Sequence, residues 1–268
     1  MNFRSFYEEI MNYEGKNIFL EMLECWDEID NAKNYLLSLK NWSNLPVEDS
    51  WNLYSLSRIL DVLTLHFQPD KKADGSNWSG INITINEYVV FVKLLGLKII
   101  FPTIYRPFDC EILESVENKN NFEIIECLFP TIMLKDLLIK RGGVIISNNS
   151  NDYNLNLINN ARIFWAYRRK NRKYEDLSHG WGSNSQWRTE FRLDIETEDE
   201  IIYNIQGEDD LNNVSNKTQD ELRGQNLEIN EAIELLINRQ FIKCTKDDND
   251  VFPYDFKYIE NKQRANGI

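Results

Sequence analysis

The side chains with the greatest chemical capacity gather in residues 162–194, which hold eight of the thirty Lys and Arg residues, three of the seven Trp and one of the two His. Within this basic island, residues 177–186 are rich in Gly, Ser and Asn. Arginine binds anionic groups, tryptophan stacks on rings and cations, and imidazole titrates near neutral pH. We therefore expect one concave binding surface, formed by Arg168, Arg169, His179, Trp181, Asn184, Gln186 and Arg188.

His179 is the candidate for acid–base chemistry, because an imidazole can take up or release a proton at neutral pH. A general base also needs an orienting partner and a nucleophile, and the neighbouring sequence defines neither. The run from His179 to Ser183 has the wrong order for the G-x-S-x-G turn of hydrolases. The sequence therefore predicts no catalytic residue, and a hydrolase that uses His179 is the alternative interpretation.

Metal and cofactor sites are not predicted either. Two His and four widely spaced Cys lack the close ligand spacing that is typical of zinc sites. Gly142 and Gly143 belong to no G-x-G-x-x-G or G-x-x-x-x-G-K pattern, so a phosphate-binding loop is not expected. We expect no metal and no cofactor.

The basic arm at residues 168–173 allows two interpretations. Its cations could contact phosphates while Trp181 or Trp187 stacks on bases. However, acids at residues 196–200 and 208–210 follow shortly afterwards and would repel a nucleic-acid backbone. The other interpretation is an internal charge network, since arginine pairs well with carboxylates in buried sites. Nucleic acid is therefore disfavoured as a partner.

Alternating residue types predict the strands that position this island. From residue 187 to 195 the odd positions are apolar or Thr, and the even positions are charged: Arg188, Glu190, Arg192 and Asp194. Such alternation is typical of a strand with one buried and one solvated face. Residues 196–200 then form a predicted hairpin loop before a strand at 201–205. Aromatic and β-branched residues at 162–168 favour another strand, so the 177–186 loop would join two strands.

The N-terminal half is predicted to be helical. Residues 1–45 carry apolar side chains at helical spacing. Further along, steps of three and four residues stack five apolar side chains on one helix face: Leu53, Leu56, Leu60, Leu63 and Phe67. Thr84 and Glu87 have the spacing of a capping box. The helix that follows, at residues 88–95, is apolar almost all round and should be buried, with Gly96 at its end.

Shorter patterns predict the remaining elements. Strands are expected at residues 97–105, 110–116, 122–129 and 144–147, and Pro102 favours an edge position for the first. Residues 131–140 are predicted as a short helix, because cations and a Gly follow it. The Asn-rich residues 148–160 should form a surface loop, and the acidic residues 207–224 a mobile segment. Asn230 is expected to cap a last helix over 231–239.

Composition bears on the compartment and the partner. A formal net charge of −13 suits a basic partner. No run reaches the ~18 apolar residues that favour a membrane-spanning helix. The first residues lack the basic and apolar regions of a secretory signal, and the cysteines form no C-x-x-C pair. We therefore expect a cytoplasmic protein with free thiols and no membrane partner.

Two stretches of the island, residues 164–169 (FWAYRR) and 176–189 (DLSHGWGSNSQWRT), resemble a motif of an uncharacterised bacterial family. That family is associated with immunity proteins encoded beside polymorphic toxins. Residues 107–112 (PFDCEI), 238–239 and 253–255 also belong to this resemblance, which spans most of residues 95–260. It implies a toxin-neutralising role and carries over no catalytic residue. A basic toxin domain would fit the acidic chain, because complementary charge speeds association.

The patterns predict an α+β protein with a helical N-terminal half packed against a mainly antiparallel sheet from the C-terminal half. We expect a single domain over residues 1–268, with a division into residues 1–96 and 97–268 as the alternative. The predicted function is a non-enzymatic binding protein with a protein partner, for which a basic toxin domain is one candidate. The alternative is a hydrolase-like enzyme that uses His179 as general acid or base.

Overall fold

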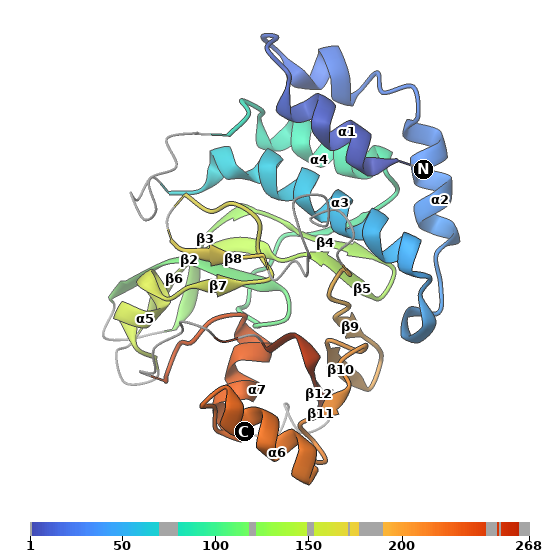
Figure 1. Ribbon diagram of the computed structural model, residues 1–268. Helices are drawn as coiled ribbons and strands as arrows, with labels where there is room; N and C mark the ends of the chain where they lie inside the picture. The colour runs from blue at the N-terminus through green and yellow to red at the C-terminus, as the bar shows by residue number, and fades with distance from the viewer. Residues whose placement is uncertain are drawn as a thin grey trace.

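A computed structural model of the protein describes residues 2–69, 80–117, 122–148, 153–170, 172–176, 190–244, 251 and 253–262. The N-terminal helices form a layer over one side of the strands, as Figure 1 shows. These helices are α1 (Phe3–Met11), α2 (Ile29–Ser38), α3 (Val47–Thr64) and α4 (Ile85–Leu94), with short helical turns at Phe19–Leu23, Trp42–Asn44 and Leu65–Phe67. The predicted helical N-terminal half is confirmed.

The rest of the chain supplies strands and three further helices. The strands are β1 (Lys98–Ile100), β2 (Cys110–Glu117), β3 (Glu123–Phe129), β4 (Thr131–Leu134), β5 (Leu137–Lys140), β6 (Gly142–Asn148), β7 (Ile163–Phe164), β8 (Tyr174–Glu175), β9 (Ile195–Glu196), β10 (Glu200–Tyr203), β11 (Asp209–Asp210) and β12 (Phe256–Asn261). The helices found in this part of the described chain are α5 (Leu155–Asn160), α6 (Asn216–Gly224) and α7 (Ile229–Asn238), with a 3-10 turn at Pro253–Asp255. In Figure 1, α6 and α7 lie at the end of the molecule opposite the N-terminal helices.

Most strand pairs are antiparallel. Among the described residues, the largest sheet has seven strands in the order β1-β4-β5-β9-β10-β12-β11, and in it β11 and β12 pair in parallel. A three-stranded sheet has the order β2-β6-β3, and β7 pairs with β8. The predicted strands β2 and β3 are therefore separated by β6, to which β2 is parallel and β3 antiparallel. This arrangement confirms the α+β class with mainly antiparallel pairing.

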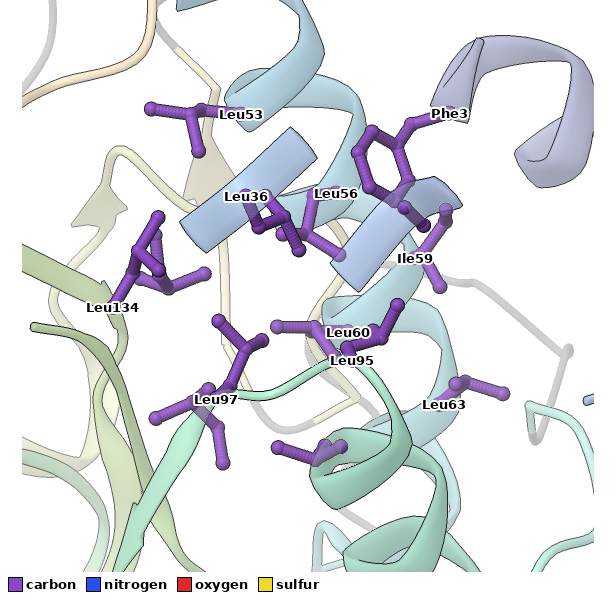
Figure 2. Close-up of a cluster of buried hydrophobic side chains, with 14 of the residues drawn as sticks. Phe3, Leu36, Leu53, Leu56, Ile59, Leu60, Leu63, Leu95, Leu97 and Leu134 are labelled. Carbon is purple, nitrogen blue, oxygen red and sulfur yellow. The ribbon is translucent and has the colours of Figure 1, made fainter. Parts of the chain in front are cut away.

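The main hydrophobic core is built around α3. Its side chains Leu53, Leu56, Leu60 and Leu63 are fully buried and belong to the same cluster as Tyr88 of α4. Figure 2 shows the α3 side chains gathered with Leu36 of α2, with Leu95 and Leu97 after α4 and with Leu134 of β4. The predicted contact between the apolar faces of α3 and α4 is thus confirmed, and each fully buried side chain contributes about 1.5–3 kcal/mol.

Helix α4 begins and ends as its sequence predicts. The Glu87 backbone N–H donates to Thr84 Oγ1 at 3.2 Å, and the Thr84 N–H donates to Glu87 Oε2 at 2.8 Å, which forms the capping box. After the helix, Gly96 has φ of +74°, the left-handed conformation that favours glycine at a C-terminus. The predicted burial of α4 on all sides is wrong, because Tyr88, Phe91 and Val92 are buried while Val90 is 40% exposed.

The predicted helix at residues 131–140 is wrong. These residues form the β4–β5 hairpin, which turns at Lys135 and Asp136, and Lys135 has a left-handed φ of 58°. All residues of both strands are buried. A strand buried on both faces does not alternate, so a short apolar run cannot be distinguished from a buried helix by periodicity.

The predicted strand at residues 187–195 is much shorter in the structure. Residues 190–194 are not in a strand, residues 187–189 lie outside the described residues, and β9 begins only at Ile195. The expected solvated face is also wrong, since Arg192 and Asp194 are buried. These two side chains pair with each other inside the protein, so their charge was no indication that they are exposed to solvent. Likewise, β7 covers only part of the strand predicted at residues 162–168.

Several segments contain more structure than predicted. Helix α5 lies in the expected 148–160 loop, and Asn154 caps it. The segment predicted to be mobile, residues 207–224, contains β11 and α6, because Leu211 and Leu222 are buried and anchor it. Helix α7 starts earlier than predicted, and its capping box uses Glu228 in place of Asn230. Strand β12 was not predicted, although it pairs with both β10 and β11.

Two predictions from composition can be compared with the structure. The four cysteines are free thiols, as expected. The described residues contain no helix long and apolar enough to cross a membrane.

Candidate functional site

The structure describes two of the seven residues that were predicted to line one surface. Arg169 is 4% exposed and lines a pocket. Arg168 is partly buried, and its Nε donates to the Tyr167 hydroxyl oxygen at 3.1 Å. The other five lie outside the described residues, so the surface they were expected to share stays a prediction: His179, Trp181, Asn184, Gln186 and Arg188.

The pocket beside Arg169, which we call the charged pocket, contains about 570 Å³ of space between protein atoms, its open mouth included. Its walls come from α3, β2, β5, residues 165–169, residues 190–192 and the residue after α7. Asp176 and Glu190, the described residues on either side of residues 177–189, both line it. Among the described lining residues the cations are Lys140, Arg141, Arg169, Arg192 and Arg239, and the acids are Asp61, Glu111, Asp176 and Glu190.

Asp61 connects three walls of the charged pocket. It projects from α3 and pairs with Lys140 of β5 through Oδ1. Its Oδ2 accepts from the Tyr167 backbone N–H at 2.9 Å and lies 3.2 Å from Arg169 Nη1. Burial acts to raise the pKa of Asp61, but the charges of Arg169 and Lys140 outweigh it and lower the pKa. Asp61 is therefore a fixed anion at neutral pH.

Arg169 joins α3 to β2. Its Nε and Nη2 donate to the two carboxylate oxygens of Glu111 at 2.6 and 2.8 Å, and both side chains are buried. Burial acts to raise the pKa of Glu111, but the guanidinium of Arg169 holds it far below its usual range. A two-pronged pair of this kind is among the stronger polar contacts in proteins, because both charges and both hydrogen bonds align.

Arg172, from the same basic arm, also points inward. It is 1% exposed, and its Nη2 donates to the carbonyl oxygens of Ile112 and Leu113 at 2.6 and 3.0 Å. The internal charge network, the second interpretation of the basic arm, is therefore confirmed for Arg169, which pairs with acids of this chain, and Arg172 is likewise held inside. Neither arginine is available to a nucleic-acid backbone.

A second charged pair is enclosed by aromatic rings. The guanidinium carbon of Arg58 lies 4.5 Å from the centre of the Tyr54 ring and 4.3 Å from that of Tyr167. Arg58 pairs with Asp176, whose Oδ2 also accepts from the Tyr54 hydroxyl at 2.6 Å. Burial raises the pKa of Asp176 despite these partners. Asp176 therefore binds a proton more readily than an exposed aspartate does.

Three arginines, Arg141, Arg192 and Arg239, gather at the C-terminal end of α7. Arg192 Nη2 donates to the carbonyl oxygen of Leu236 at 2.6 Å, and Arg141 Nη1 to that of Asn238 at 2.8 Å. Helix ends leave such carbonyls without partners, and cations are favourable there. A carboxylate pairs with two of these arginines, Arg192 and Arg239.

That carboxylate is Asp194. Its oxygens accept from Arg192 Nε at 2.7 Å and from Arg239 Nη2 at 2.8 Å. Burial acts to raise the pKa of Asp194, and the charges of Arg192 and Arg239 lower it overall. Asp194 therefore stays ionised and holds the two guanidiniums in place.

Backbone strain occurs in the wall formed by residues 165–169. Trp165 and Arg168 have φ of 50° and 56°, a left-handed conformation that residues other than glycine rarely adopt. Each such residue costs on the order of 1–3 kcal/mol, and strain of this kind tends to cluster at functional sites. The Trp165 ring lies 4.0 Å from the guanidinium carbon of Arg192, so the strained backbone places an aromatic face against a cation.

Most residues of the charged pocket were missed because they belong to other predicted elements. Asp61 lies on the far side of α3 from the leucine stripe, and Lys140 and Arg141 were interpreted as a helix end. One signal was present: ionisable residues stand inside apolar runs, as Asp61 does between Leu60 and Val62. An ionisable side chain in such a run is buried, and burial requires a partner.

The described part of the chain contains no group of three or more His, Cys, Asp and Glu side chains placed to hold a metal ion. Comparison of the chain with protein-family models, with curated proteins and with solved structures found no match. The resemblance to immunity-type proteins therefore stays an expectation from the residues quoted above.

Proposed function

We propose that the protein is a non-enzymatic binding protein and that the charged pocket is its recognition site. The observation that carries this proposal is that the charged side chains of the pocket hold one another in place. Asp61 and Glu111, which line the pocket, each accept from more than one N–H group. Asp194 does not line it, but it accepts from two lining residues, Arg192 and Arg239. A preorganised site binds well because little side-chain freedom remains to be lost.

The same arrangement favours binding over catalysis. A general base works best with a pKa near the working pH, and the pKa values of Asp61, Glu111 and Asp194 are lowered. Their lone pairs also face arginine, lysine or backbone donors. The hydrolase alternative depends on His179, which lies outside the described residues, and Asp176 with its raised pKa is the described acid that would support it.

A second candidate site is the acidic surface, which is favoured by three acidic side chains in contact with solvent. The ion pair of Glu208 with Lys217, at 3.7 Å, leaves both side chains exposed. Glu198, Asp199 and Glu208 are exposed. Their neighbours are already engaged, since Glu196 pairs with Arg106 and Lys262, and Asp209 is buried. These exposed acids would attract a basic protein partner such as a toxin domain.

Co-expression with the product of the neighbouring gene tests these candidates, with cell survival and direct binding as the two measurements. Arg239→Gln changes the charged pocket, and a Glu198→Lys, Asp199→Lys double variant changes the acidic surface. Arg172→Lys is the matched control, a buried arginine that does not line the pocket. We expect Arg239→Gln to lose binding, and His179→Ala to keep part of it because no proton transfer is required.

The outcomes separate the candidates. Loss of binding only in the surface variant would move the recognition site to the acidic surface. If no partner is bound and a measurable turnover disappears in His179→Ala or Asp176→Asn, the binding proposal is wrong and the hydrolase is favoured.

A further inference from the structure

We propose that Arg141, Arg192 and Arg239 form an oxyanion subsite within the charged pocket, which takes a phosphate or carboxylate group of the partner that the pocket binds. All three line the pocket. This inference rests on the proposed function, since it names the chemistry of the ligand that the same pocket would recognise.

The cluster carries more positive than negative charge. Asp194 is shared between Arg192 and Arg239. Arg141 donates to the carbonyl oxygen of Asn238, and within the described residues it forms no ion pair with a carboxylate. The C-terminus of α7 adds a partial negative charge of about one half. The three positive guanidiniums are thus accompanied by one carboxylate and one helix end, and a bound anion would neutralise the remaining positive charge.

Two buried donors in the cluster have no protein acceptor. They are Nη1 of Arg192 and Nε of Arg141. Buried polar groups in proteins almost always have a hydrogen-bond partner, so such exceptions require an explanation. An oxyanion has several lone pairs and could accept from both arginines, whereas a halide offers no fixed directions.

The electrostatic environment agrees with this geometry. Burial, and next the charge of Arg239, lowers the pKa of Arg141 to about 9. Burial also lowers the pKa of Arg192 to about 10, although Asp194 opposes the change. Both guanidiniums remain protonated at neutral pH, and burial is the main cause of their lowered pKa values.

The arginines are also held in orientation before a ligand binds. The Leu236 carbonyl and Asp194 fix two sides of Arg192, and the Trp165 ring covers one face of its guanidinium. A planar fork presented in this way matches the geometry of carboxylate and phosphate groups, which lysine cannot reproduce. The geometry therefore favours an oxyanion over a halide.

The test is titration of the purified 268-residue chain with inorganic phosphate and with acetate at constant ionic strength, with chloride as the reference. Calorimetry gives the affinity, and tryptophan fluorescence reports on Trp165. We expect phosphate or acetate to bind more tightly than chloride, and the comparison of the two identifies the preferred group. Arg192→Lys should weaken that binding about tenfold or more, because it removes a charge-assisted hydrogen bond.

Arg172→Lys is the matched control. Arg172 is a buried arginine whose Nε also lacks an acceptor, but it does not line the pocket. Its affinity for the anion should stay within about twofold of wild type, since it removes a guanidinium outside the subsite. If Arg192→Lys does not fold, Trp165→Phe provides the test. The fluorescence change that the anion causes in wild type should be absent from this variant.

Two results would overturn the subsite. One is wild-type protein that binds phosphate and acetate no more tightly than chloride. The other is an anion affinity, or a fluorescence change, that Arg192→Lys and Trp165→Phe leave unaltered. Either failure is distinct from failure of the proposed function, which is measured by partner binding of Arg239→Gln and requires no free anion.

Discussion

Replacing Asp61 with Asn should destabilise the protein strongly, because two buried cations depend on its carboxylate. Lys140 and Arg169 both pair with Asp61, and the exposed fraction of each of these cationic side chains is 4%. Asparagine keeps one oxygen, which can still accept from the Tyr167 N–H. Its other group is an amide NH₂, a donor that would face the donors of Lys140 or Arg169.

The expected loss is about 3–5 kcal/mol in the free energy of unfolding, the range for removing one partner of a buried ion pair. Domains are typically stable by only about 5–15 kcal/mol, so this single change would remove a large fraction. The cost arises mainly from the buried ammonium of Lys140, which loses its carboxylate partner, whereas Arg169 keeps its pair with Glu111. Removing Lys140 as well should therefore recover part of it.

Urea denaturation monitored by tryptophan fluorescence measures this, with a change in the midpoint at constant slope as the sign of a pure stability effect. Asp199→Asn is the control, since Asp199 is exposed and surface changes stay within about 0.5 kcal/mol. The double variant Asp61→Asn, Lys140→Met should be more stable than Asp61→Asn. A loss below about 1 kcal/mol, or a double variant no better than the single, would refute the role given to Asp61.

Three further predictions concern pH, packing and association. The folded-state pKa values of Asp61, Glu111 and Asp194 are lowered, so these carboxylates stabilise the fold fully above the unfolded pKa of about 4. This stabilisation is lost as the pH falls towards the folded-state values. In thermal melts, the melting temperature should therefore fall more steeply with decreasing pH for wild type than for Asp61→Asn. Leu60→Ala should lower the free energy of unfolding by about 2–5 kcal/mol because Leu60 is fully buried. Leu20→Ala is the control and should cost less than about 0.5 kcal/mol, because that side chain is 59% exposed. An equally small loss for Leu60→Ala would contradict the core assignment. Charge reversal at Glu198, Asp199 and Glu208 should slow association with a basic partner and flatten its salt dependence, and an unchanged association rate would exclude the acidic surface.

Local periodicity was sufficient to predict the helical layer. The three-and-four spacing of leucines in α3 and the capping box of α4 depend on contacts within one or two turns, and both were found as predicted. The β4–β5 hairpin was mistaken for a helix because its strands are buried on both faces. Strand β12 was missed for a related reason, since its partners β10 and β11 lie about fifty residues earlier in the chain.

The composition of the basic island placed Arg169 near a candidate site, and arginine chemistry predicted that it could pair with acids of the same chain. Which acids it pairs with was decided only by the fold. Asp61 and Glu111 are 108 and 58 positions away from it, as the residue numbers show. An ion pair depends on distance through space, and no periodic pattern brings α3, β2 and residues 165–169 together. Burial of the packed helical layer against the sheet does so, and it turns scattered charges into one pocket.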